Sequence, residues 1–146
     1  MSASGPAFDL ATTFGVFDLM RYRMKNQYNR LGSEATASAG WKRFYRLQDG
    51  RRCPIGHLIT NDVYYAEGRR RGRLIEGESV LEGDVCAAVR DSIGWLPDVA
   101  LLRDCQLVHD DFPPHLWGQQ FALLHKKWFG VGGVYAGEDQ TCTTPT

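Results

Sequence analysis

The clearest pattern in the chain is a hydrophobic stripe at helical spacing near its N-terminus. The stripe recurs at intervals of three or four residues and consists of Leu10, Phe14, Phe17, Met20, Met24, Tyr28 and Leu31. The opposite face is basic and carries Arg21, Arg23, Lys25 and Arg30. This period predicts an amphipathic helix that ends at Gly32. A core helix with solvated arginines is favoured over a helix that binds a membrane surface or nucleic acid.

The segment after this helix contains a small polar stretch and then two strand-like runs. Residues 33–40 are small and polar, which predicts a flexible connector. Two short strand-like runs follow, at residues 42–47 and 51–55, and they flank the turn signal Asp49-Gly50. This arrangement predicts a small β-hairpin.

Helical signals return in the second half of the chain. A brief helical turn is expected at 61–66, and the Gly-punctuated, Arg-rich stretch 67–78 is expected to loop into solvent. Later helices are predicted to begin near Gly83, Pro97 and Pro114.

Together these elements predict a single α+β domain, mostly α, in which about four helices pack with a small β-hairpin. Residues 1–40 hold the N-terminal amphipathic helix and flexible connector, 41–130 form the core α+β domain, and 131–146 form a loose C-terminal tail.

Charge is distributed unevenly along the chain although the formal net charge is zero. Residues 1–73 hold 13 Lys and Arg against 6 Asp and Glu, and residues 74–146 hold 4 against 11. The basic half predicts an anionic partner, or docking of one half on the other. Such docking between copies predicts a symmetric homodimer, with apolar anchors at Trp41, Trp95, Trp117 and Trp128.

Composition narrows the setting of the protein. The longest apolar runs are shorter than a membrane helix requires, and the first residues lack the pattern of a secretory signal. We therefore expect a protein of the cytoplasm that does not bind a membrane. In that compartment the four cysteines are expected to be thiols: Cys53, Cys86, Cys105 and Cys142.

The basic residues predict a binding surface for a protein partner or a nucleotide-like anion, and nucleic acid is a further candidate. The candidate binding residues are Lys42, Arg43, Arg46, Arg51, Arg52, Arg69, Arg70, Arg71 and Arg73. Tyr45, Tyr64 and Tyr65 are candidate stacking groups beside them.

Two alternatives involve cysteine and histidine. Cys53 and His57, and Cys105 and His109, share a four-residue spacing that two pairs could use to form a tetrahedral zinc site, the only cofactor predicted. This alternative is a zinc-stabilised nucleic-acid-binding module. Against it, free cysteine on an apolar stripe commonly serves as a small hydrophobe.

The second alternative is a cysteine-dependent hydrolase or transferase. Cys53 would be the nucleophile and His109 the base, with Asp110, Asp104 or Asp111 as the orienting acid. The neighbouring Arg51 and Arg52 would favour the thiolate.

A set of residues spread over roughly 44–130 resembles small uncharacterised proteins of bacteria and their phages. The pattern includes Cys53-x-Ile55-Gly56-x-Leu58-Ile59, Glu76-Gly77-x-x-Val80 and Gln106-x-x-His109-Asp110, and the first and last of these are its most specific parts. The resemblance implies a phage or prophage origin and a location in the bacterial host cytoplasm, and it implies no particular activity. The favoured prediction is therefore a small non-enzymatic binding protein of phage type that uses its basic surface.

Overall fold

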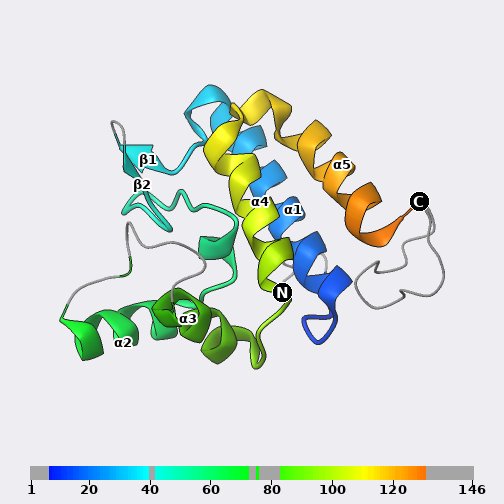
Figure 1. Cartoon of the computed structure of the whole chain (residues 1–146). Helices are drawn as coiled ribbons and strands as arrows, with labels where there is room; N and C mark the ends of the chain where they lie inside the picture. Colours follow the sequence, from blue (N-terminus) through cyan, green and yellow to red (C-terminus); the bar gives the residue numbers. More distant parts are fainter. Residues whose placement is uncertain (1–6, 40–41, 73–74, 76–82, 131–146) are drawn as a thin grey trace.

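The chain folds into two groups of helices joined by an irregular segment, as seen in the computed structural model (Figure 1). The structure describes residues 7–39, 42–72, 75 and 83–130. The helices are α1 (Thr13–Leu31), α2 (Asn61–Arg71), α3 (Gly83–Ile93), α4 (Val99–Asp111) and α5 (Trp117–Phe129). Helix α5 packs against both α1 and α4, and α2 packs against α3.

The larger group of helices, α1, α4 and α5, packs around the apolar stripe predicted for the first helix. Thr12 caps α1 by accepting a hydrogen bond from the amide of Gly15 at 3.0 Å. The ring of Phe17 meets the rings of Phe121 and Phe129 at centroid distances of 6.0 and 5.2 Å. All three aromatic side chains are buried, so α1 and α5 share one aromatic core.

Helix starts and ends follow the capping signals in the second half of the chain. The predicted helix start at Gly83 is confirmed, and the helix ends just before Gly94. The carboxylate of Asp98 caps α4 by accepting from the amide of Ala100 at 2.9 Å. Before α5, a 3₁₀ turn at Pro114–Leu116 leads directly into the helix.

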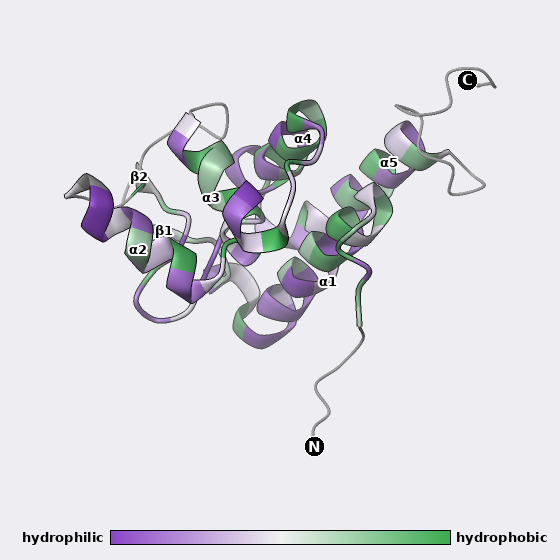
Figure 2. Cartoon of the chain, turned by 90° about the horizontal axis from the view of Figure 1, so that it is seen from below, coloured by the Kyte–Doolittle hydropathy of each residue, from purple (hydrophilic) through white to green (hydrophobic). Residues whose placement is uncertain are grey.

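The predicted loop at 67–78 is wrong over its first part, because α2 continues as a helix through Arg71. Arginines are good helix formers, and cations are favourable at the C-terminal end of a helix. The helix ends at Gly72, which has a φ of +78°. This end of α2 is among the most hydrophilic parts of the ribbon (Figure 2).

The predicted α+β class is wrong, because the protein is helical. In the described part, paired extended backbone is limited to two-residue segments, β1 (Ser38–Ala39) with β2 (Lys42–Arg43), and a single bridge between Arg46 and Arg52. The chain does reverse at Asp49-Gly50, but the returning segment turns into a 3₁₀ helix at Ile55–His57 and does not extend a sheet. Pro54 has no amide proton to donate to a ladder.

Position 56 requires glycine because the backbone of Tyr45 lies close to it. A Cβ atom at this position would lie 1.8 Å from the carbonyl oxygen of Tyr45. The side chains of Tyr45, Cys53 and Ile55 are buried in the core. The segment that contains the Cys-x-Ile-Gly motif is therefore irregular in its backbone but tightly packed.

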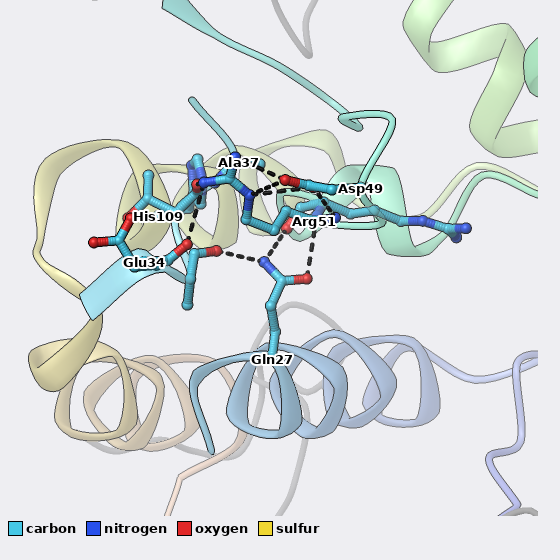
Figure 3. A network of polar contacts seen from close by, with 9 residues as sticks. Gln27, Glu34, Ala37, Asp49, Arg51 and His109 are labelled. Carbon is cyan, nitrogen blue, oxygen red and sulfur yellow. Dashed lines mark hydrogen bonds and ion pairs between the residues drawn. The ribbon is translucent and has the colours of Figure 1, made fainter. Parts of the chain in front are cut away.

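The buried side chain of Gln27 on α1 holds this irregular segment in place (Figure 3). Its amide nitrogen donates to the carbonyl oxygens of Ala35 and Arg52 at 2.7 and 2.9 Å. Its amide oxygen accepts from the backbone amide of Arg52 and from Nε2 of His57, both at 3.1 Å. One side chain thus satisfies polar groups from three places in the chain that lie outside α-helices.

A second anchor holds residues 33–39, the described part of the predicted flexible connector. Ala35 and Ala37 are fully buried. The amide of Ala37 donates to Nε2 of His109 on α4 at 2.9 Å, and the contact is visible in Figure 3. This segment is therefore fixed between α1 and α4.

No helix in the described ranges is long and apolar enough to cross a membrane.

The Gln27 network gives a direct test of how the irregular segment is held. We expect Gln27→Ala to lower the free energy of unfolding by about 2–3 kcal/mol, because it strands buried carbonyl and amide groups. Urea unfolding measures this difference. Gln119→Ala, which truncates an exposed glutamine on α5, is the matched control and should change stability by less than about 0.5 kcal/mol. Equal losses for the two variants would contradict the role assigned to Gln27.

Candidate anion-binding pocket

The predicted basic residues do not form one surface. Arg51 pairs with Asp49 at 2.9 Å and also donates to the carbonyl oxygen of Thr36. Arg70 pairs with Glu67 at 2.7 Å and lies 3.4 Å from Asp84.

The other predicted residues of this set occupy several places. Arg69 is exposed on α2, and Arg71 is the last residue of that helix. Lys42 and Arg43 form β2, whereas Arg73 lies outside the described residues. Two of the predicted arginines, Arg46 and Arg52, approach each other at the start of α2.

Arg52, but not Arg46, lines a cavity of about 210 Å³. Its polar lining comes from α1, from the irregular segment, from the start of α2 and from α3, and consists of Arg23, Arg52, His57, Thr60, Asn61 and Ser92. Leucine and isoleucine side chains line the rest of the cavity. The pocket is therefore a polar site built from four parts of the chain.

The arginines are fixed by neutral oxygen acceptors. Arg23 donates to the carbonyl oxygen of His57 at 3.1 Å, and Arg52 donates to Oδ1 of Asn61 at 3.4 Å. Arg46 lies behind them, where it donates to the same Asn61 oxygen and to the carbonyl oxygen of Ile59. Arg46 is only 9% exposed, and its buried Nε has no hydrogen-bond partner.

No aspartate or glutamate in the described ranges forms an ion pair with Arg23, Arg46 or Arg52. Arg21, in contrast, pairs with Asp18. Burial is the largest cause that lowers the pKa of Arg52, and the charges of Arg46 and Arg23 lower it further. Arginine still stays protonated at neutral pH, so within the described residues the positive charge of the pocket is not balanced by an ion-paired carboxylate.

His57 responds to this positive potential. Its pKa is lowered to about 3, first by burial and then by the charges of Arg52, Arg23, Arg46 and Arg30. The imidazole is therefore neutral at physiological pH. Its Nε2 carries the proton, because it donates to the amide oxygen of Gln27.

The start of α2 adds polar groups to the pocket. Thr60 caps the helix by accepting from the amide of Val63 at 3.4 Å. The amide of Thr60 donates to Oγ of Ser92 at 3.0 Å, which leaves the Ser92 hydroxyl proton able to donate. The helix N-terminus carries partial positive charge and so supports anion binding beside the arginines.

Only one of the predicted stacking tyrosines is exposed. Tyr45 and Tyr64 are buried, and the guanidinium carbon of Arg46 lies 4.2 Å from the centroid of the Tyr64 ring. Tyr65 is 51% exposed and meets Tyr64 edge to face at a centroid distance of 5.1 Å. The Tyr65 phenol raises the pKa of Arg52, whereas burial and the charges of the other arginines lower it.

Two further hollows lie among the described residues. One of about 600 Å³ lies between α1 and the start of α5 and has both charged lining residues, such as Arg21 and Lys25, and aromatic ones, such as Tyr22 and Trp117. Its arginine, Arg21, is already paired with Asp18. A hollow of about 270 Å³ between α4 and α5 has Lys127 on its rim, paired with Asp104 at 2.8 Å.

The residues of the alternative catalytic set make contacts within the fold. Nδ1 of His109 bonds Asp110 at 2.8 Å, and Nε2 accepts from the amide of Ala37, so both ring nitrogens are occupied. Cys53 is fully buried, and its sulfur accepts from the amide of Gly56 at 3.4 Å. His109 and Asp110 therefore act as structural groups in this fold.

The alternative zinc residues also do not assemble. Among the described residues there is no group of three or more His, Cys, Asp or Glu placed to hold a metal ion. His57 bonds Gln27, His109 bonds Asp110, and burial raises the pKa of the Cys105 thiol. Cys105 belongs to the apolar core on α4.

The predicted tryptophan anchors lie largely inside the fold. Trp117 is buried, and Nε1 of Trp95 donates to the carbonyl oxygen of Leu10 at 2.6 Å. Nε1 of Trp128 donates to Asp104 at 2.9 Å. Trp41 lies outside the described residues.

Several pocket residues were not among the predicted binding residues. Thr60 and Asn61 stand at the start of the helical turn predicted at 61–66, and Arg23 lies on the basic face predicted for the first helix. Ser92 lies on α3 without any distinguishing motif. Comparisons with protein-family models, curated proteins and solved structures gave no match for the chain.

The shift at His57 predicts an acid-sensitive fold. In the unfolded chain His57 takes up a proton below about pH 6.5, whereas in the folded chain it does so only near pH 3. The free energy of unfolding therefore falls as the pH falls through this window. We expect the pH slope of the unfolding free energy to be smaller in His57→Gln by up to about 1.4 kcal/mol per pH unit. Urea unfolding across this window measures the slope. His115→Gln, which removes an exposed histidine, is the comparison variant. Identical slopes for wild type and His57→Gln would contradict the shift.

Proposed function

We propose that the protein is a non-enzymatic binding protein that holds a phosphate-bearing anion in the pocket at the start of α2. The observation that carries the proposal is the convergence of Arg23, Arg46 and Arg52 without a carboxylate among the described residues. Clustered guanidinium groups repel one another and are costly to bury, so an anion bound between them stabilises the arrangement.

The donor types favour a phosphate group. Guanidinium groups match phosphate oxygens in geometry, and Arg23 and Arg52 line the cavity from different elements. The Ser92 hydroxyl and the α2 N-terminus add neutral donors of the kind that accompany phosphate sites. A cavity of about 210 Å³ is below the usual range of about 300–1,000 Å³ for drug-sized ligands, so it suits a single small group.

A binding role is favoured over catalysis at this site because the pocket side chains are engaged in holding structure. The proton of neutral His57 is donated to Gln27, and the Thr60 side chain caps α2. As part of the same proposal, we infer that this binding takes place in the cytoplasm of a bacterial host, which is what the resemblance of the sequence to small phage-type proteins implies.

The proposal is tested with inorganic phosphate and full-length protein in a buffer free of phosphate and sulfate. Isothermal titration calorimetry should show one site per chain. Arg23→Gln should weaken binding by roughly 10- to 100-fold, because it removes one charge-assisted contact of about 1.5–3 kcal/mol. Binding should also weaken as chloride concentration rises.

Arg103→Gln is the matched control, since Arg103 is an exposed arginine on α4 that does not line the cavity. Its affinity should equal that of the wild type. Equal weakening by the two variants would indicate general attraction to a basic protein, and the absence of phosphate binding by the wild type would reject the proposal.

A further inference from the structure

An exposed aromatic ring lies next to the anion pocket, on the same face of α2 as Asn61. Asn61 lines the cavity, and Tyr65 follows it by four residues, which places the two side chains one above the other on the helix. Four residues of α-helix rise by about 6 Å. The ring of Tyr65 is therefore about one helical turn from the pocket.

Arg52 connects the pocket with this ring. Its guanidinium lines the cavity and donates to Asn61, and it is close enough to interact electrostatically with the Tyr65 phenol. The edge-to-face contact with buried Tyr64 supports Tyr65 from one side. The other surface of the ring is left for a partner, consistent with an exposed fraction of 51%.

A large exposed aromatic residue beside a cationic pocket suits a ligand that joins a phosphate to a planar ring. Base stacking on an aromatic side chain does not depend on the identity of the base, because every base has a π-face. A nucleotide has its base separated from its phosphate by one sugar, which matches a spacing of about one helical turn.

We propose that the ligand of the pocket is a nucleoside monophosphate, with its phosphate bound between Arg23 and Arg52 and its base stacked on Tyr65. This inference rests on the anion site proposed above and adds the identity of the ligand class.

A free mononucleotide is favoured over a nucleic-acid strand by the distribution of unpaired charge. A strand requires cationic contacts repeated along its backbone. Arg51 and Arg70 are paired with Asp49 and Glu67, whereas Arg23 and Arg52 come from different elements to line one cavity.

The test compares three ligands by isothermal titration calorimetry on the full chain: adenosine 5′-monophosphate, ribose 5-phosphate and adenosine. The monophosphate should bind about 10-fold more tightly than ribose 5-phosphate, because one stacked base contributes roughly 1–3 kcal/mol. Adenosine should bind at least 10-fold more weakly than the monophosphate, since it lacks the group that the arginines hold.

Variants at Tyr65 separate stacking from anion binding. Tyr65→Ala should reduce the affinity for the monophosphate to that for ribose 5-phosphate and leave the ribose 5-phosphate affinity unchanged. Tyr65→Phe should retain the wild-type preference. Tyr22→Ala, at a half-buried tyrosine lining the separate 600 Å³ hollow, is the control and should also retain the preference.

The two proposals fail in different ways. Equal wild-type affinities for the monophosphate and ribose 5-phosphate, both sensitive to Arg23→Gln, would overturn the nucleotide inference and leave the anion site standing. Loss of binding for both phosphorylated ligands would overturn both proposals. An oligonucleotide without a terminal phosphate could bind more tightly than the monophosphate and be equally sensitive to Tyr65→Ala. That result would overturn the mononucleotide assignment in favour of a strand.

Discussion

The positions of the pocket residues depend on the need to satisfy the polar backbone groups of a buried, irregular segment. Residues 44–60 lie between two groups of helices and have few ladder bonds of their own. Buried amide and carbonyl groups without partners are costly. The amide of Gln27 meets this need, and the same bonds fix the backbone of Arg52 and the ring of His57. Helix α1 therefore positions two pocket residues that are distant from it in sequence.

His109 acts as the second fixed point. By accepting from the amide of Ala37 while bonding Asp110, it ties the segment after α1 to α4. A histidine next to an aspartate is a familiar catalytic pattern in sequence, but burial and two engaged nitrogens make it a structural group here. The two anchors together explain how a segment without regular structure keeps a defined shape.

Among the described residues, some arginines of the N-terminal half pair with carboxylates and others bond neutral oxygens. Arg21, Arg51 and Arg70 each find a carboxylate, whereas Arg23 and Arg52 meet neutral oxygens around a cavity. Burial and then the charges of the arginines lower the pKa of His57, which reduces the stability of the fold at acid pH. Residues whose placement does not favour stability are typical of functional sites. The clustered arginines are the clearest example in the described part of the molecule.

Sequence patterns determined the helices, because hydrophobic period and capping residues act locally: the α1 stripe, the Gly83 start and the Asp98 cap all follow from spacing and residue type. The sequence patterns wrongly predicted a β-hairpin over residues 42–55. Burial of Tyr45, Cys53 and Ile55 against helices overrides the alternation that is typical of a hairpin. They also identified Arg46 and Arg52 only as members of a larger basic set. The tertiary structure alone decided which arginines pair with described carboxylates and which neutral groups surround the others. Arg23, Arg52, Thr60 and Ser92 come together only when α1, α2 and α3 pack around the irregular segment. Pairing of charges over such separations depends on packing in three dimensions, and no local pattern of residues encodes it.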